Sequence, residues 1–299
     1  MNVLEIKGLE KRFGEKKVLC GLDLDVPEKS VFGFVGKNGA GKTTTMKIAL
    51  GLLKADAGEV RVCGEKVSYG NCATNRYIGY LPDVPEYYTF MTPREYLGFC
   101  GEITGMPRKD IGDRAEEMLQ LVGLGEEKRR IRGFSRGMKQ RLGIAQALMA
   151  RPKLLICDEP TSALDPLGRK EILDVLVAAK EETTILFSTH ILSDVEHICD
   201  SMALLNDGRI VMQGSIEDVK KKRRGNSYEI ELENPADGTL LAERFGLKTL
   251  APGRLVLDKT ENLSEVMRFM ADDHIAFFRV EKQESTLEDI FLEAIGKEG

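Results

Sequence analysis

The sequence predicts an α/β fold in which a parallel sheet alternates with helices and carries a glycine-rich phosphate-binding loop, followed by a small α+β domain. Strand-like and helical segments alternate from Val31 to about Val219, as in parallel sheets connected by helices. A glycine-rich loop lies between the first of these strands and the helix that follows it. After the basic run from Lys220 to Gly225 the composition changes, which marks the expected start of the second domain.

An antiparallel pair of strands is expected before the parallel sheet. The segments VLEIKGLEKRF and KKVLCGLDLDV have the composition of strands, and Gly14 and Glu15 form the turn between them. Later in the first domain, MALLNDGRIVMQG predicts a hairpin with Asp207 and Gly208 at its turn.

The segment VFGFVGKNGAGKTTTMKIAL contains the pattern G-x-x-x-x-G-K-[ST] at Gly36, Gly41, Lys42 and Thr43. An apolar run suited to a buried strand precedes the pattern, and apolar residues at helical spacing follow it. Glycines let successive backbone N–H groups point at phosphate oxygens, and the helix N-terminus adds the positive end of its dipole. We therefore expect phosphate binding, with Lys42 reaching the β and γ phosphates and the Thr43 hydroxyl helping to hold Mg²⁺.

A mostly helical segment is expected from Thr92 to Arg151. Thr92, Pro93 and Glu95 combine an N-cap, a first-position proline and a capping-box carboxylate. The segment IGDRAEEMLQLVGLG follows, with apolar residues on one face. These features predict a helical subdomain over about residues 86–151.

Acidic residues follow the apolar strand in KLLICDEP, and a histidine follows the strand in TTILFSTH. The carboxyl end of a buried parallel strand faces the crevice in which ligands bind. Asp158 is expected to complete the Mg²⁺ coordination, and Glu159 to polarise the attacking water as general base. His190 is predicted to contact the γ-phosphate; the alternative is that it only ends a strand before the next helix.

The segment FSRGMKQRLGIAQALMA predicts a helix with Ser135 as its N-cap and Gly137 in its first turn. This helix N-terminus is a second anion site, because Gly137 lets a ligand approach it closely. One nucleotide on one chain does not need two such sites, whereas two chains that share two nucleotides use all four.

Together these segments resemble the ATP-binding cassette of ABC transporters: GKNGAGKT, then FSRGM at the position of the LSGGQ signature, then LLICDEP, SALD and STH. The resemblance covers residues 1 to about 220, with the motifs in order and at the usual separations. It implies a P-loop NTPase cassette with an antiparallel β subdomain and a helical subdomain. In this family two cassettes dimerise head to tail, and each signature helix covers ATP held by the other.

The resemblance also implies roles for individual residues. Phe13 matches the aromatic residue that stacks on adenine, where tyrosine is more common, and Asp165 matches the residue that links the two sites of a dimer. Ser135 and Gly137 match the signature's contacts to the partner's nucleotide. The residues expected to hold ATP within one chain are Gly36, Lys37, Asn38, Gly39, Ala40, Gly41, Lys42, Thr43 and Thr44.

The sequence departs from the family pattern in two places. Asp83 stands where a glutamine usually senses Mg²⁺ and the permease; its carboxylate can still face a cation, with a shorter reach, so it is a candidate metal ligand. Arg136 and Met138 stand where the signature usually has glycine and glutamine. Since Ser135 and Gly137 are retained, we expect the phosphate contact of the signature to be kept.

The last part of the chain is expected to form a separate acidic domain. Residues 227–299 contain 8 Lys and Arg against 16 Asp and Glu, a net charge of −8, whereas the whole chain carries −5. The expected order is strand, helix, strand, helix, strand, helix, closing on TLEDIFLEAI. Residues 221–226 are interpreted as a basic linker after a nucleotide-binding domain at 1–220, with contact to anionic lipid as the alternative. The S-x-G-M-K-Q-R form of the signature and the acidic tail resemble the drug, bacitracin and sodium exporter branch.

Composition argues against several other classes of protein. The near-balanced charge gives no basic excess for nucleic acid, and the six cysteines have neither metal-ligand nor redox spacing. No export signal is visible near the N-terminus, and no apolar run approaches the roughly 20 residues that span a bilayer. We therefore expect a soluble chain in the cytoplasm.

The expected function is that of an ATPase subunit with ATP and Mg²⁺ as ligands. It would act as a homodimer that drives a separately encoded membrane permease, for export, and would be held by that permease at the inner face of the cell membrane. Tyr87, Tyr88 and Phe90 belong either to the docking surface or to local packing. Ribosome-type relatives usually have two cassettes per chain, and the 94 positions between Gly41 and Ser135 exclude the long coiled coil of chromosome and repair types. A regulatory or immunity cassette that moves no solute stays open.

Overall fold

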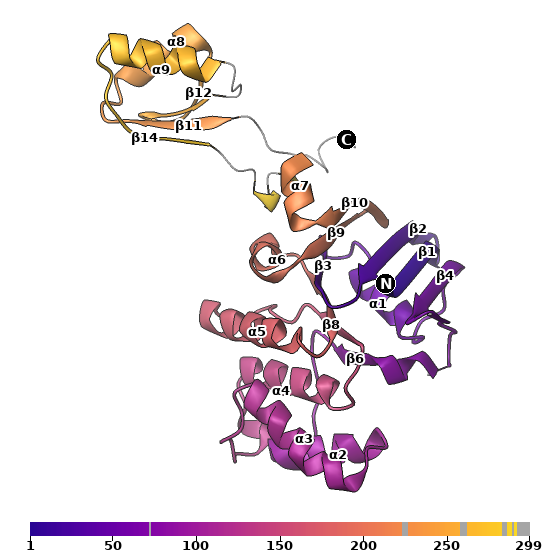
Figure 1. Ribbon diagram of the computed structural model, residues 1–299. Helices are drawn as coiled ribbons and strands as arrows, with labels where there is room; N and C mark the ends of the chain where they lie inside the picture. Colours follow the sequence, from indigo (N-terminus) through magenta and orange to yellow (C-terminus); the bar gives the residue numbers. More distant parts are fainter. Residues whose placement is uncertain (72, 223–226, 258–261, 283–285, 289, 292–299) are drawn as a thin grey trace. The chain divides into compact units, whose positions relative to one another are not determined.

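The computed structural model describes residues 1–71, 73–222, 227–257, 262–282, 286–288 and 290–291 (Figure 1). The chain divides into two compact units, Met1–Ile216 and Glu217–Gly299, which are described separately below. Within these described ranges, no helix combines the length and the apolar character needed to cross a membrane.

The first unit is built on a sheet with the strand order β10-β9-β3-β8-β7-β6. All neighbouring pairs are parallel except β9 and β10, which form the predicted hairpin around Asp207 and Gly208. All six residues of β3 and of β8 are buried, as expected for inner strands covered on both faces. The strands are β3 (Val31–Gly36), β6 (Ile78–Leu81), β7 (Leu154–Asp158), β8 (Thr184–Thr189), β9 (Ser201–Asn206) and β10 (Arg209–Ser215).

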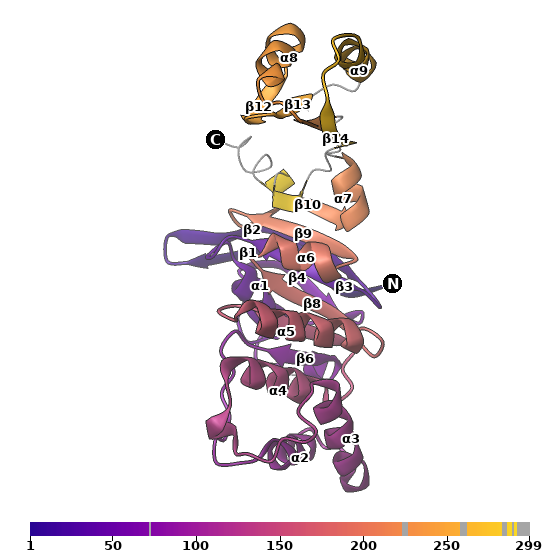
Figure 2. The same cartoon turned by 90° about the vertical axis from the view of Figure 1, so that its left-hand side faces the viewer.

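A second, antiparallel sheet has the order β2-β1-β4-β5. Its strands are β1 (Asn2–Phe13), β2 (Lys16–Pro27), β4 (Ala57–Val62) and β5 (Glu65–Lys66). Figures 1 and 2 show this sheet and α1 (Lys42–Ala49) on one face of the parallel sheet, with α5 (Pro166–Ala179) and α6 (Leu192–Ile198) on the other. The predicted α/β cassette with an antiparallel subdomain is therefore confirmed.

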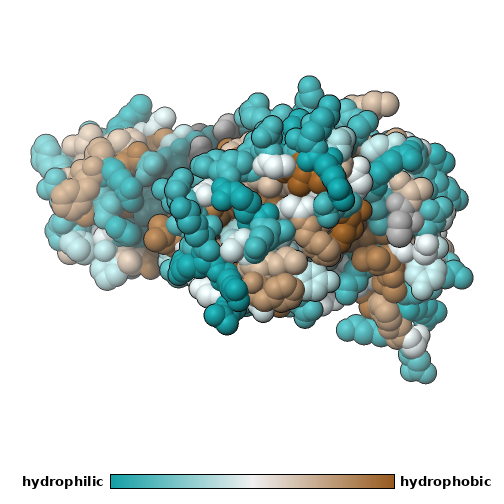
Figure 3. Space-filling view, turned by 90° about the horizontal axis from the view of Figure 1, so that it is seen from below, coloured by the Kyte–Doolittle hydropathy of each residue, from teal (hydrophilic) through white to brown (hydrophobic). Residues whose placement is uncertain are grey.

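The surface carries the polar side chains that this arrangement leaves outside. Of all residues in the chain, 30% are charged. Figure 3 shows one face, which is largely hydrophilic, with apolar side chains in several smaller groups between the charged ones.

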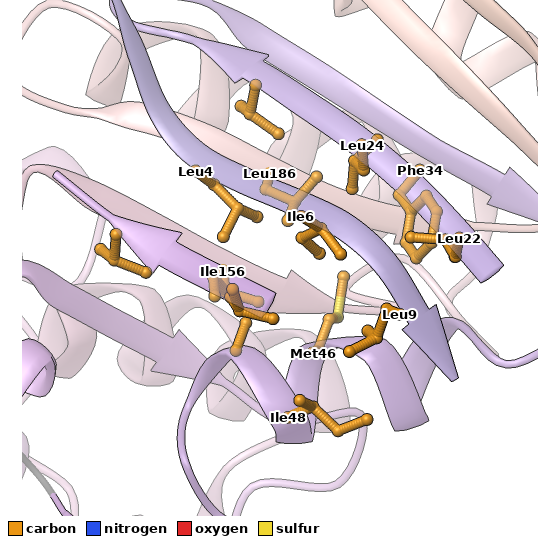
Figure 4. Close-up of a cluster of buried hydrophobic side chains, with 14 of the residues drawn as sticks. Leu4, Ile6, Leu9, Leu22, Leu24, Phe34, Met46, Ile48, Ile156 and Leu186 are labelled. Carbon is orange, nitrogen blue, oxygen red and sulfur yellow. The ribbon is translucent and has the colours of Figure 1, made fainter. Parts of the chain in front are cut away.

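The space between the two sheets is filled with apolar side chains (Figure 4). Leu4, Ile6 and Leu9 of β1 point toward Phe34 of β3 and Met46 of α1, and a register shift between Ile6 and Leu9 brings Leu9 to the same side of the strand. Each of these side chains is at most 1% exposed. Helix α1 is thereby fixed between the sheets, and its N-terminus is held beside the end of β3.

The helical segment consists of α2 (Pro93–Ile103), α3 (Arg108–Leu121) and α4 (Arg136–Leu148), with a short 3-10 turn, η2 (Ile131–Gly133), before α4; another 3-10 turn, η1 (Ala73–Tyr77), precedes β6. The capping box is present: the backbone N–H of Thr92 donates to Oε2 of Glu95 at 2.8 Å, and the Thr92 side chain accepts from the backbone of Glu95. Arg114 of α3 is buried and donates to Glu182, which precedes β8, and to the carbonyl of Leu148. This side chain ties the helices to the parallel sheet.

The second unit contains an antiparallel sheet with the order β12-β13-β11-β14. Side chains of α8 and α9 complete its core, in which Ile230, Leu241 and Val266 are fully buried. Its elements are β11 (Tyr228–Leu232), α8 (Asp237–Phe245), β12 (Lys248–Ala251), β13 (Arg254–Leu257), α9 (Leu263–Asp272) and β14 (Phe277–Lys282). The preceding α7 (Ile216–Lys222) begins at the last residue of the first unit.

One element of the second unit differs from the prediction. A single strand was expected between its two helices, but TLAPGRLVL forms the hairpin β12–β13, with Gly253 at a φ of 77° in the turn. The dipeptide Pro252-Gly253 is a turn signal that the single-strand prediction did not use. Of the basic run, Lys220 to Lys222 belong to α7, and residues 223–226 lie outside the described residues. Residues 289 and 292–295 of the closing segment TLEDIFLEAI also lie outside them, so the helix predicted there is described only in part.

Candidate functional site

A cavity of about 340 Å³ lies where the loops after four strands of the parallel sheet meet. The loop after β3 and the first turn of α1 supply most of its lining, and one or two residues come from each of the loops after β6, β7 and β8. The lining residues are Asn38, Gly39, Gly41, Lys42, Thr43, Thr44, Asp83, Glu159, Ser162 and His190. This is the carboxyl edge of the sheet, where ligands bind in open α/β folds.

The glycine loop has the backbone shape that its sequence predicts. Gly39 and Gly41 have φ angles of 82° and 114°, which favour glycine, and Gly41 is the N-cap of α1 without a side-chain acceptor. A Cβ atom at Gly36 would lie 2.6 Å from the carbonyl oxygen of Leu205. The loop therefore brings bare backbone to the start of α1, which suits an anion such as phosphate.

Lys42 is the first residue of α1, and its side chain is 5% exposed. Its ammonium group donates to the carbonyl oxygens of Gly36 at 2.6 Å and Lys37 at 3.2 Å. The same group lies 3.1 Å from Oε1 of Glu159, without the angle of a hydrogen bond. Lys42 is thus held by the loop backbone and directed at the acid after β7.

Asp158, at the end of β7, accepts hydrogen bonds from two hydroxyl groups. Oγ1 of Thr43 lies 2.7 Å from Oδ2, and Oγ of Ser188 lies 2.7 Å from Oδ1. The carboxylate is 3% exposed, so the two hydroxyls fix both of its oxygens. Asp158 does not itself line the cavity, but it contacts Thr43, which does.

These oxygen donors suit Mg²⁺. Among the described residues no group of three or more His, Cys, Asp or Glu side chains is arranged to hold a metal. Mg²⁺ commonly uses one or two protein oxygens and takes its other ligands from phosphate and water. The Thr43 hydroxyl and the Asp158 carboxylate fit that pattern, since they already lie together beside the phosphate loop.

Glu159 follows β7 in an unusual backbone conformation, with a φ of 50°. Its backbone N–H donates to the Ser188 carbonyl at 3.2 Å and to the Ser188 hydroxyl at 3.0 Å, which holds that conformation. Oε2 of Glu159 lies 2.8 Å from Nδ1 of His190. The 13% exposed carboxylate therefore lies between Lys42 and His190 at the wall of the cavity.

Asp83 reaches the cavity from the loop after β6. Partial burial raises the pKa of its carboxyl group, the Arg136 guanidinium opposes this, and the negative charges of Asp158 and Glu159 add to the increase. Nη2 of Arg136 lies 3.5 Å from Oδ1 of Asp83.

Several predicted site residues do not line the cavity. Lys37 and Ala40 belong to the turn of the glycine loop, where the Ala40 N–H donates to the Lys37 carbonyl at 3.1 Å. Phe13 lies at the end of β1, is 50% exposed, and has Nζ of Lys11 at 5.3 Å from its ring centroid. Within one chain, therefore, the structure leaves Phe13 outside the cavity.

The signature residues lie elsewhere on the first unit. Ser135 is the N-cap of α4, and its hydroxyl accepts from the backbone of Met138 at 3.2 Å, as predicted. Asp165 is the N-cap of α5 and accepts from Gly168 at 3.0 Å. A Cβ atom at Gly137 would lie 3.9 Å from Leu164, so the SALD loop lies beside the signature helix. Ser135 and Gly137 thus form an exposed helix start outside the cavity, beside the SALD loop that ends at Asp165.

Two serines of this site were missed by sequence reasoning. Ser162 lines the cavity and Ser188 holds both Asp158 and Glu159. Ser162 is the first residue of SALD and Ser188 is the first residue of STH, so both serines belong to motifs that the sequence analysis quoted. Within those motifs, nothing in the sequence singles the two serines out.

Comparison with known proteins adds evidence independent of this geometry. A family model described as "ABC transporter" matches residues 19–162. An uncharacterized ABC transporter ATP-binding protein, YxlF of Bacillus subtilis (strain 168), is 35% identical over 98% of this chain and 99% of its own length. The bacitracin transport ATP-binding protein BcrA of Bacillus licheniformis is 33% identical over 98% of this chain and 97% of its own. Both similarities therefore include the second unit.

Solved structures show the same fold. A structure described as the ATP binding subunit of an ABC transporter has a TM-score of 0.65 and 31% identity, covering 74% of this chain and 92% of that one. Another, of cbiO1 from Clostridium perfringens, described as part of the ABC transporter complex cbiONQ, has a TM-score of 0.68 and 27% identity over 74% and 92% of the two chains.

Proposed function

The chain belongs to the ATP-binding proteins of ABC transporters and is an ATPase, and we propose that two copies bind ATP and Mg²⁺ between them to drive a membrane permease formed by another chain. One observation carries this proposal. Glu159 lies between Lys42 and His190 at the wall of a cavity whose other side is the phosphate loop. A base, a cation and a phosphate cradle in one cavity are the parts that phosphoryl transfer to water requires.

Within one chain, each group has a separate task. The loop N–H groups and the Lys42 ammonium bind the phosphates of ATP, and Lys42 exchanges its contact with Glu159 for the γ-phosphate. Glu159 then takes a proton from the attacking water as the water oxygen bonds to the γ-phosphorus. The bond between the γ-phosphorus and the bridging oxygen breaks, and ADP and inorganic phosphate are formed. His190, 2.8 Å from Glu159, holds the carboxylate in place and lies at the cavity wall for contact with the γ-phosphate.

Thr43 and Asp158 are the residues that we assign to Mg²⁺, with Asp83 as an outer candidate. The bound ion would neutralise charge on the β and γ phosphates. The 2.7 Å contact between Thr43 and Asp158 already places both oxygens beside the phosphate loop.

Two copies are proposed because the cavity of one chain lacks the signature residues. Ser135 and Gly137 form an exposed helix start that suits an anion, and Asp165 lies at the end of the adjoining SALD loop. In a head-to-tail pair, this helix start would face the γ-phosphate held by the partner's phosphate loop. Phe13, which is half exposed, would stack on adenine.

The permease is proposed to dock near the loop after β6. Tyr87 is largely used in local packing, since its hydroxyl donates to the Lys139 carbonyl at 2.5 Å and its ring meets Tyr96 edge-on at 5.2 Å. Tyr88 and Phe90 are 52% and 62% exposed and lie 6.0 Å apart. These two exposed rings are available to contact an apolar helix of the partner. Through that partner the chain would be held at the inner face of the cell membrane.

Export is the proposed direction of transport, since the relatives that cover nearly the whole chain include a bacitracin transport protein. The test is purification of the full chain from its native membranes in mild detergent. Recovery of a stoichiometric partner with several transmembrane helices supports the proposal. A soluble partner in its place would contradict the permease assignment and favour a regulatory cassette.

A further inference from the structure

The two departures from the usual signature and sensing residues lie beside each other in the fold. Asp83 follows β6, and Arg136 is the first residue of α4, 53 positions later in the sequence. Nη2 of Arg136 is 3.5 Å from Oδ1 of Asp83. A carboxylate in place of an amide and a guanidinium in place of a glycine thus form an ion pair.

The backbone on either side of this pair is fixed by other contacts. Nε2 of the buried Gln140 donates to the backbone carbonyl of Asp83 at 2.8 Å, and the Tyr87 hydroxyl donates to the Lys139 carbonyl. Gly143 of α4 has no side chain, and a Cβ atom there would clash with Leu81 and lie 2.7 Å from the Tyr87 hydroxyl. The loop after β6 therefore lies tightly along α4, and among the described residues it is Arg136 that pairs with the Asp83 carboxylate.

The Asp83 carboxylate also faces the proposed metal site. It lines the cavity together with Thr43 and Glu159. Burial raises its pKa, the Arg136 guanidinium lowers it, and the charges of Asp158 and Glu159 raise it further, so the carboxylate lies within the fields of all three groups. The carboxylate thus pairs with the Arg136 guanidinium and lines the cavity in which Mg²⁺ and nucleotide are proposed to bind.

We propose that Arg136 is a positioning residue that holds the Asp83 carboxylate against the signature helix and competes with Mg²⁺ for it. This inference rests on the proposed function, because it needs the nucleotide and metal site at the phosphate loop. Binding of the metal with nucleotide draws Asp83 away from Arg136 and releases the guanidinium at the start of α4. By linkage, holding Asp83 on Arg136 weakens metal binding to the same extent.

The size of the effect follows from the exposure of the pair. The Arg136 and Asp83 side chains are 45% and 47% exposed, so their attraction is that of a surface ion pair and is screened by salt. Loss of such a pair changes a binding constant by roughly two- to five-fold. The effect is modest, and a double-mutant cycle separates it from a general change in charge.

The test uses the full chain with ADP, which binds without turnover, and Mn²⁺ as a paramagnetic probe of the metal site. Mn²⁺ affinity of the ADP complex is measured by electron paramagnetic resonance for the wild type, Arg136→Met, Asp83→Asn and the double variant. Arg136→Met is expected to tighten Mn²⁺ binding by roughly two- to five-fold at low salt, and to have no such effect in the Asp83→Asn background. Lys139→Met removes a positive charge from the same turn of α4 and serves as the matched control.

Two results overturn the inference. One is a change in Mn²⁺ affinity for Arg136→Met that is the same with and without Asp83. The other is a change in Mn²⁺ affinity for Lys139→Met, in the wild-type background, that is as large as the change for Arg136→Met. ADP binding without metal is measured alongside by calorimetry. Absence of ADP binding in every chain, the wild type included, contradicts the proposed nucleotide site itself, whereas ADP binding without coupling contradicts only the role of Arg136.

Discussion

Oε1 of Glu159 lies 3.1 Å from Nζ of Lys42, and both side chains are nearly buried, at 13% and 5% exposure. This contact joins the end of the phosphate loop to the end of β7. Because Lys42 also donates to the carbonyls of Gly36 and Lys37, its ammonium already has three oxygen neighbours. A γ-phosphate oxygen in the place of the Glu159 carboxylate would leave the ammonium with the same number of oxygen neighbours. The carboxylate would then be free to accept a proton from water.

Replacing Glu159 with glutamine tests its role as base. The amide keeps the shape of the side chain but accepts no proton, so turnover should fall at least about 100-fold. ATP affinity should change little, because the phosphate contacts come from the loop and Lys42. The expected result in ATP is a trapped dimer on size-exclusion chromatography. Undiminished turnover would rule out Glu159 as the base.

Lys42→Ala should lose nucleotide affinity itself. Among the described residues, Lys42 is the only lysine or arginine that lines the cavity, and the substitution removes its charge. Loss of a charged hydrogen bond to phosphate corresponds to at least about ten-fold weaker binding. Calorimetry with ATP measures it, and Lys47→Ala, an exposed lysine in the last turn of the same helix, is the control. Equal binding by both variants would contradict the assignment of Lys42.

Much of the first unit could be predicted because its signals are local. The glycine loop, its flanking strand and helix, and the capping box at Thr92 each depend on residues within a few positions of one another. Asp158 could be placed beside Thr43 because Asp158 ends β7, Thr43 follows β3, and both strands end at the same edge of the sheet. The prediction that these two residues are neighbours does not depend on the register between the strands.

Contacts between distant segments could not be predicted in the same way. Ser188 lies 30 positions from the carboxylate that it holds, and Arg136 lies 53 positions from Asp83. Arginine and aspartate side chains are usually exposed, so the sequence around Arg136 and Asp83 indicates a solvated surface. Only the packing of the loop after β6 along α4 brings Arg136 and Asp83 together.

Ser135→Ala tests whether the signature helix acts on nucleotide held by another copy. Turnover should fall, while ATP binding by a dilute, monomeric chain should stay the same, since Ser135 does not line its own chain's cavity. Loss of the N-cap also costs α4 about 1 kcal/mol. Ser135→Thr keeps a hydroxyl cap and is the control. Specific activity should rise with protein concentration in the wild type; activity that is independent of concentration down to the monomer would contradict shared sites.

Arg114→Met tests the contact that ties the helical segment to the parallel sheet. The Arg114 side chain is 1% exposed and pairs with Glu117 and Glu182, both at 2.8 Å. These carboxylates are 49% and 41% exposed and can be rehydrated, so the loss should be about 2 kcal/mol, less than for a fully buried pair. Thermal unfolding at pH 7 should show a fall in Tm of roughly 4–8 °C, against little change for Arg108→Met, whose side chain is 90% exposed.

The pH dependence of that difference gives an independent check. The hydrogen bond from Arg114 holds the pKa of Glu182 below its ordinary value of 4.5. A depressed carboxyl pKa adds stability that is complete above pH 4.5 and is lost as the pH falls through the value in the folded protein. The gap in Tm between the wild type and Arg114→Met should therefore be constant from pH 7 to about pH 5 and then narrow in more acidic buffer. A gap that stays the same at pH 3.5 would mean that Arg114 stabilises the fold through packing and the Leu148 carbonyl alone, without the ion pair to Glu182.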